Sequence, residues 1–196
     1  MKKFFILCLM AFVLCSCNNI PPKRIIKTEK WTFYEAKDYF GDIVQSSTEP
    51  KSVVIDEYNT NGMLVHHRMY YRHSSDDIFK VEEHITHNEQ GEIIKIDTYK
   101  TISWDDKQNE HIILYEVDGV WVRVINGGEP QVMNDFTPLR KPKETYEEIY
   151  LDEIEKNGVY IVSKKYNVYG DITEIIAKHE YEYCIMKREI EYYNNI

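Results

Sequence analysis

The sequence lacks several features that would narrow its function at once. It has no excess of positive charge, because 24 Lys and Arg stand against 33 Asp and Glu and give a formal net charge of −9. Nucleic-acid binding, which needs basic residues against the phosphates, is therefore not expected. It also has no nucleophile-elbow, phosphate-loop, dinucleotide or zinc-protease motif. No short motif identifies an enzyme, and the sequence predicts a protein without catalytic residues.

Long hydrophobic runs are also missing. The longest apolar stretch extends from Phe4 to Leu14 and follows Lys2 and Lys3. It is too short for a transmembrane helix, which needs about 20 apolar residues. A short cationic segment before an apolar stretch of this length is typical of a secretory signal peptide. The sequence therefore predicts an exported protein whose signal peptide comprises residues 1–16.

The end of this segment, Leu14-Cys15-Ser16-Cys17, resembles the lipobox of bacterial lipoproteins. The resemblance implies lipid attachment at Cys17, cleavage before it, and a membrane anchor of diacylglycerol and an acyl chain such as palmitate. Asn18 stands where, in the best-known sorting rule of that family, an Asp retains lipoproteins on the inner membrane. An outer-membrane location is therefore expected in a host with two membranes, on either the periplasmic or the surface side.

Cysteine is scarce once the signal peptide is removed. Cys8 and Cys15 leave with it and Cys17 carries the lipid, so Cys184 alone remains and no internal disulfide is expected. Because residues 1–16 contain two lysines and no acidic residue, their removal changes the formal net charge from −9 to −11. We expect residues 17–30 to form the lipidated Cys and a tether, and residues 31–196 to form a single β domain with a long loop at about 126–145.

Alternating apolar and polar residues dominate the chain from Lys51 onward. The runs are rich in β-branched residues and Tyr and are separated by turn sequences such as Asp118-Gly119 and Asn157-Gly158. The sequence predicts an all-β fold, a long antiparallel meander of about nine or ten strands that forms a curved sheet. Barrel-like and sandwich-like arrangements both remain open. Residues 32–44 fit one short N-terminal helix or a strand equally well, because Phe33, Ala36, Phe40 and Ile43 have helical spacing.

Three segments share a pattern in which a polar turn ends in Gly before a strand. They are residues 57–64, 87–94 and 165–174, and the last is the best copy. The pattern resembles the degenerate hairpins of Rhs-like, tyrosine–aspartate (YD) repeat proteins and related lipoproteins of Bacteroides-type bacteria. The resemblance implies a curved β scaffold without catalytic residues, and it supplies no activity.

Tyrosine is the most abundant aromatic residue, with 16 copies, most of them in or next to strands. Packing between strands explains most of them, but rings exposed on one sheet face would form a binding platform for a protein or glycan. The candidates for that platform are Tyr70, Tyr71, Tyr99, Tyr181 and Tyr183. No metal site and no cofactor are predicted, because adjacent residues such as His66 and His67 point to opposite faces of a strand.

Three functions are consistent with these observations. The first is a non-catalytic binding or structural module that is anchored in the cell envelope and recognises a protein or a glycan. The second is a periplasmic inhibitor or immunity-type protein that binds a basic target through its acidic surface. The third is a hydrolase with a site near the loop at 126–145.

Overall fold

The structure is a computed structural model and describes residues 24–72, 78–103, 108–134, 136–138, 158–180 and 182–194. These residues form strands and turns, and no helix occurs among them, which confirms the all-β prediction. The strands are β1 (Ile26–Tyr39), β2 (Asp42–Gln45), β3 (Ser52–Tyr58), β4 (Leu64–Arg72), β5 (Ile78–His87), β6 (Ile93–Ile102), β7 (Gln108–Val117), β8 (Val120–Ile125), β9 (Gln131–Met133), β10 (Tyr160–Tyr166), β11 (Ile172–His179) and β12 (Glu182–Tyr192).

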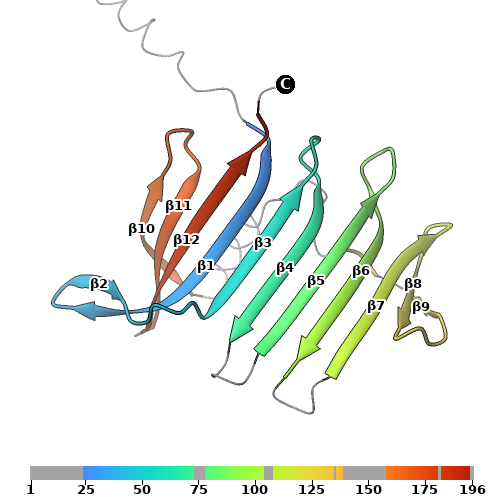
Figure 1. Cartoon of the computed structure of the whole chain (residues 1–196), viewed down its shortest axis with the longest axis horizontal. Helices are drawn as coiled ribbons and strands as arrows, with labels where there is room; N and C mark the ends of the chain where they lie inside the picture. Colours follow the sequence, from blue (N-terminus) through green and yellow to red (C-terminus); the bar gives the residue numbers. More distant parts are fainter. Residues whose placement is uncertain are drawn as a thin grey trace, which may run out of the picture.

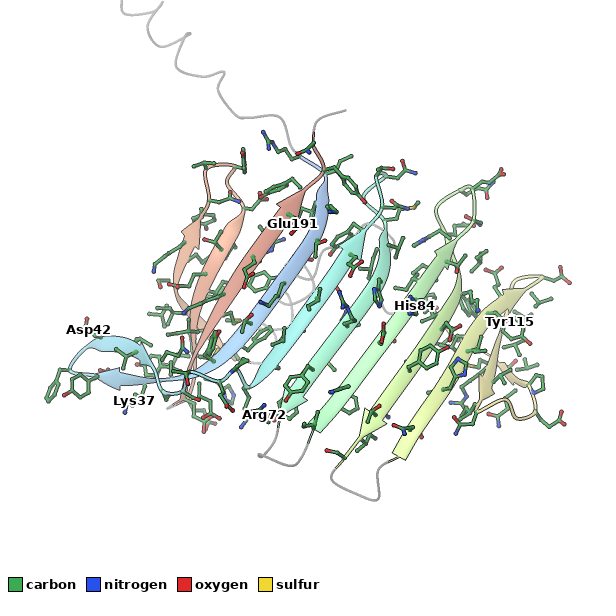
Figure 2. All side chains as sticks on the ribbon, viewed as in Figure 1. Lys37, Asp42, Arg72, His84, Tyr115 and Glu191 are labelled. Carbon is green, nitrogen blue, oxygen red and sulfur yellow. The ribbon has the colours of Figure 1, made fainter. Side chains whose placement is uncertain are left out.

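All strands belong to one 12-stranded antiparallel sheet with the order β10-β11-β12-β1-β3-β4-β5-β6-β7-β8-β9 (Figure 1). β10 and β9 are its two edges, so the sheet does not close into a barrel, and it is a single sheet rather than two stacked ones. β2 pairs only with β1, and this hairpin, which carries Lys37 and Asp42, projects beyond the rest of the sheet (Figure 2). The prediction of a long meander is confirmed, with the barrel-like and sandwich-like alternatives excluded.

The meander is interrupted once, where the last strand pairs with the first. β12 lies antiparallel to β1 along most of its length, from Tyr192 beside Ile26 to Tyr183 beside Ala36. Strands β10–β12 and β3–β9 therefore form two sets of strands on either side of β1. Part of the expected loop at 126–145 is strand β9, which pairs with β8, and residues 139–145 lie outside the described part.

The segment at 32–44 forms strands and not a helix. β1 continues to Tyr39, and Phe40 and Gly41 form the turn to β2 with φ values of 55° and 93°. Pairing with β12 on one side and β3 on the other outweighs the helical spacing of its apolar residues. β1 also begins at Ile26, so the end of the expected tether, residues 26–30, belongs to the domain.

Alternation along the strands gives the sheet two different faces. The core face carries two buried clusters. The first cluster comprises Trp31, Val54, Ile172, Ile175, Ala177 and Met186, and the second comprises Tyr58, Leu64, Ile85, Ile93 and Trp121. Burying each of the larger side chains among them contributes roughly 1.5–3 kcal/mol, and the methyl group of Ala177 contributes less. The charged face, on the other side, presents residues such as Lys30, Arg68, Glu82 and Asp97, which alternate with core-face residues along their strands.

The core face also holds charged groups. Glu29 and Asp56, paired in register on β1 and β3, are 0% exposed, and Arg188 on β12 is 4% exposed. Nε and NH2 of Arg188 lie 2.9 and 2.6 Å from Oε2 of Glu29, and the indole of Trp31 donates to the same oxygen at 3.1 Å. Nδ1 of His67 lies 2.6 Å from Oδ1 of Asp56. Each buried carboxylate thus has a basic partner, as the low-dielectric interior requires.

Three turns share one construction. In each, an Asn begins a five-residue turn and a Gly at its fourth position has φ between 74° and 88°. The Gly N–H donates to the Asn carbonyl, the Asn N–H donates to the carbonyl of the fifth residue, and the Asn side chain accepts from the N–H of that residue. These turns span residues 59–63, 88–92 and 167–171. They coincide with the three segments that share a sequence pattern, so that pattern encodes a turn.

Candidate functional site

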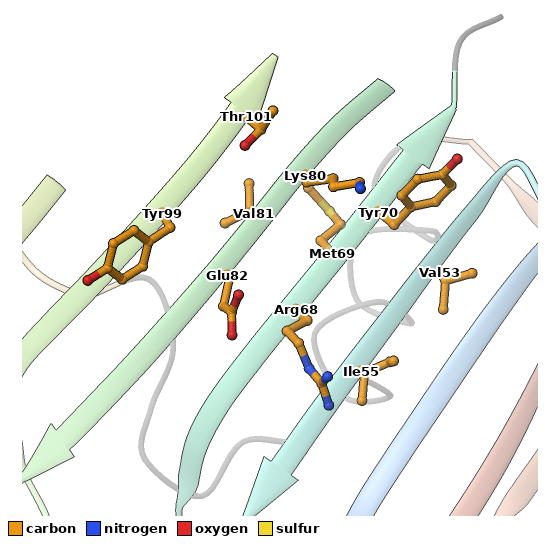
Figure 3. A pocket seen from close by; sticks show the side chains of 10 residues that line it. All are labelled: Val53, Ile55, Arg68, Met69, Tyr70, Lys80, Val81, Glu82, Tyr99 and Thr101. Carbon is orange, nitrogen blue, oxygen red and sulfur yellow. The ribbon is translucent and has the colours of Figure 1, made fainter. Parts of the chain in front are cut away.

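A groove crosses the charged face over β3, β4, β5 and β6. Antiparallel register places two rows of side chains side by side across these strands. The first row is Ile55, Arg68, Glu82 and Tyr99, and the second is Val53, Tyr70, Lys80 and Thr101. The groove between them has a volume of about 340 Å³, and Met69 and Val81 complete its lining (Figure 3).

The two tyrosines stand at opposite ends of the groove. Tyr70 extends from β4 and Tyr99 from β6, with Lys80 and Glu82 of β5 between them (Figure 3). Tyr99 is 48% exposed, so a large part of its ring is available to a ligand. The site thus combines two aromatic rings with a cation and a carboxylate.

The ring of Tyr99 is fixed by a chain of contacts behind it. It stacks on the imidazole of His111, with 4.3 Å between the ring centroids and 7° between the planes. Nε2 of His111 lies 2.6 Å from Oδ1 of Asp97, and Lys95 donates to the other oxygen of this carboxylate at 3.1 Å. Burial alone would raise the pKa of Asp97, but the hydrogen bonds from His111 and Lys95 outweigh it and lower that pKa. The ionised carboxylate holds His111, and through it Tyr99, in one orientation.

Cations surround the other ring. The guanidinium of Arg72 and the ammonium of Lys80 each lie 5.9 Å from the centroid of Tyr70, and Nε of Arg72 donates to the Tyr70 hydroxyl at 3.1 Å. Arg68 is tied to Glu57 through one guanidinium nitrogen. Its side chain is 43% exposed. The groove therefore offers donors from Arg68 and Lys80 and an acceptor in Glu82.

Two other candidates from the sequence, Tyr71 and Tyr183, do not line this groove. Tyr71 pairs with Ser52 and Phe79 on the core face, one position from Tyr70. Tyr183 lies on β12, beneath the ammonium of Lys178 at 5.2 Å from its ring centroid. Tyr181 and the lipid-attachment residue Cys17 lie outside the described residues. Cys184 is a free thiol packed against the first core cluster, and burial raises the pKa of that thiol.

No family model matches the chain, and neither does any curated protein or solved structure. The function is therefore inferred from the geometry of the groove itself. Within the described part of the chain, no helix is long and apolar enough to span a bilayer.

Sequence reasoning missed most of the polar groups of this face. Arg68, Lys80 and Glu82 are unremarkable charged residues in their own strands and meet only through cross-strand register. The same holds for a cluster of His66, Glu82 and His84, whose ligand atoms lie within 4.8 Å of one another. The expectation that His66 and His67 point to opposite faces is confirmed, since His67 meets Asp56 on the core face. Neither strand alone indicates that His66 faces His84 on the next strand, so the sequence carried no direct signal for this cluster.

Proposed function

We propose that this chain is a non-catalytic, lipid-anchored protein of the cell envelope that binds a glycan in the groove of its charged face. The observation that carries the proposal is the placement of Tyr70 and Tyr99 at the two ends of one groove, with charged side chains between them. Aromatic rings present flat apolar faces against which the C–H groups of a sugar ring can pack. Arg68 and Lys80 supply donors and Glu82 an acceptor for its hydroxyl groups.

The dimensions of the groove support a short recognition segment. Small-molecule sites have volumes of roughly 300–1,000 Å³, and the groove, at about 340 Å³, lies at the lower end of this range. The groove therefore suits a few groups of a longer chain that continues beyond it on the surface. Because His111 already holds Tyr99, little conformational entropy is lost when a ligand packs on this ring.

The anchor belongs to the same proposal. A lipid at Cys17 would hold the domain at the membrane, and each buried CH₂ of its acyl chains contributes about 0.8 kcal/mol. We propose the outer membrane as the site of attachment. In this arrangement a low affinity of each groove is sufficient, because many anchored copies on one surface can bind one polysaccharide together.

Glycan binding is tested with the soluble domain, residues 18–196, against polysaccharide extracted from the host envelope. We expect Tyr99→Ala to weaken binding about tenfold, because loss of an aromatic anchor costs about 1–2 kcal/mol. The matched control is Tyr166→Ala, since Tyr166 is 57% exposed and lies on β10, far from the groove. Affinity electrophoresis or calorimetry measures the effect, and circular dichroism confirms the fold of both variants.

The other outcomes of this experiment separate the alternatives. Equal losses in the two variants would contradict binding at the groove. Capture of a basic protein that is released at high salt, in place of polysaccharide, would overturn the proposal and favour an inhibitor of the immunity type. Retention of nothing in low or high salt would leave the protein as a structural lipoprotein.

The lipid anchor is tested independently in the full-length protein. We expect Cys17→Ala to abolish incorporation of a labelled fatty acid and to release the protein from the membrane fraction, because the thiol that forms the thioether is gone. Cys184→Ala is the control, since Cys184 lies in the domain and packs against its core. Persistence of the label in the Cys17 variant would show that the lipid is attached elsewhere.

A further inference from the structure

Two histidines and a glutamate meet on the charged face beside the groove. His66 on β4 and His84 on β5 are direct cross-strand partners, and Figure 2 locates His84 on β5. Glu82 precedes His84 by two residues, so it lies on the same face and diagonal to His66. One ligand atom from each of the three side chains lies within 4.8 Å of the others.

The distances are close to those in a metal site. Nε2 of His66 lies 2.9 Å and Nε2 of His84 lies 3.6 Å from Oε1 of Glu82. Ligand atoms bound at 2.0–2.2 Å to one tetrahedral ion are separated by about 3.3 Å. Small movements of these side chains would therefore place the three ligand atoms around one metal ion. The imidazole rings are stacked, with 4.3 Å between centroids and 14° between planes, so one ring must turn to aim its lone pair at the ion. His84, with a side chain 54% exposed, is free to turn.

The outer contacts of His66 match those of metal-binding histidines. Such a histidine directs its other ring nitrogen to a carboxylate, which fixes the ring and its tautomer. Nδ1 of His66 lies 3.5 Å from Oε1 of Glu57. Glu57 in turn is held by the guanidinium of Arg68. The less mobile of the two histidines is thus already oriented, since its side chain is only 17% exposed.

We propose that His66, Glu82 and His84 bind a divalent transition-metal ion of the zinc type. Two imidazoles and one carboxylate are a ligand set that such ions accept. Three protein ligands leave a further coordination position, which water or an external ligand occupies. The proposal does not depend on glycan binding, although Glu82 also lines the groove and the two sites share this carboxylate.

Zinc binding is measured by calorimetric titration of the soluble domain, prepared without a histidine tag, with Zn²⁺ as the only ligand. We expect saturable binding of one ion, weakened at least about 100-fold in His84→Ala because one of three ligands is lost. The matched control is His179→Ala, since this histidine is also exposed but lies on β11. We expect the Zn²⁺ affinity of this variant to equal that of the unsubstituted domain. Co²⁺ provides a second readout, because its visible spectrum reports tetrahedral coordination, and that spectrum disappears in His84→Ala.

Glu57 is a positioning residue, because it orients His66 and is not itself a ligand of the ion. Its substitution is therefore expected to change the Zn²⁺ affinity in a way that depends on the new side chain. Glu57→Ala weakens Zn²⁺ binding about 10–100-fold, whereas Glu57→Gln, whose amide oxygen can still accept from Nδ1, retains most of the affinity. Absence of saturable Zn²⁺ binding in the folded domain would overturn the proposal. So would an affinity that does not change in His84→Ala, or one that falls equally in His179→Ala, because the ion would then bind elsewhere. In those cases the contacts of Glu82 with the two imidazoles are hydrogen bonds or ion pairs alone.

Discussion

Glu29 is a charged residue whose environment is that of a core residue. It is fully buried, and it neutralises Arg188 on the neighbouring strand while accepting hydrogen bonds from Trp31 and Tyr58. A buried ion pair contributes little net stability compared with apolar residues, but the loss of one partner leaves an uncompensated charge. Substitution of either Glu29 or Arg188 alone is therefore expected to destabilise the fold.

The substitution Glu29→Gln is expected to lower the free energy of unfolding by about 3–5 kcal/mol, because the buried charge of Arg188 then loses the carboxylate of Glu29. Urea unfolding, followed by the fluorescence of Trp31 and the other tryptophans, measures the loss. Glu189→Gln is the control one position away from Arg188. Its side chain is 72% exposed and pairs with Lys30 at the surface, so the loss is about 0–1 kcal/mol. A similar loss in both variants would show that the buried pair has no special role.

Individual residues of the site were predictable only in part. Tyr70 and Tyr99 could be selected because the Tyr side chain is amphipathic and every second position of a strand faces outward. Tyr71 was selected for the same reason and faces the core, because one position along a strand reverses the face. The pairing of His66 with His84 could not be predicted, because 18 residues separate them and only the register of β4 and β5 makes them neighbours.

At the scale of strands and turns, local sequence determined most of the architecture. The alternating pattern from Lys51 onward predicted strands, and turn sequences such as Asp118-Gly119 marked the connections between them. The helix considered at 32–44 shows the limit of local information, since a strand that pairs on both sides overrides helical spacing. Nothing in either segment alone predicted that β12 would lie beside β1.

The five-residue turns give a prediction at this scale. Gly91 has φ 84°, a left-handed conformation that a Cβ disfavours, and among the described residues such a Cβ would meet only the flexible Met63 side chain, at 3.2 Å. Gly91→Ala is therefore expected to lower the free energy of unfolding by about 1–2 kcal/mol. Gly91→Asn, which adds a Cβ as well but tolerates this conformation, is expected to lose clearly less. Thermal and urea unfolding compare the variants, and an equal loss would attribute the effect to crowding by Met63 instead of backbone strain.

At the scale of the whole molecule, the two ends of the described chain meet. The N–H of Tyr193 donates to the carbonyl of Ile25 at 3.0 Å, which continues the pairing of β1 with β12. The partners of this pairing are separated by about 150 residues or more along the chain, and Lys30 and Glu189 by 159. Contacts of such long range slow folding, because the chain entropy is lost before the contacts form.

A circular permutant tests this point. Residue 194 is joined to residue 24 by a short linker, and new ends are opened within residues 139–157, between β9 and β10, which are not paired with each other. We expect refolding to be roughly tenfold faster, because β1 and β12 become neighbours in sequence, while the stability at equilibrium changes little. Stopped-flow refolding measures the rate, with the linear domain carrying the same linker at its end as the control. An unchanged rate would mean that the pairing of β1 with β12 is not the slow step.

The central position of β1 has a mechanical consequence. A pull that enters the molecule at residue 24 acts lengthwise on a strand that is bonded to β12 along one side and to β3 along the other. The strand is then loaded in shear, so many hydrogen bonds share the force at the same time. In a hairpin that is unzipped, by contrast, the hydrogen bonds break one after another. The end of the chain that leads to Cys17 thus enters the sheet through a strand that can bear tension, and the hairpins at both edges of the sheet lie outside its direct path.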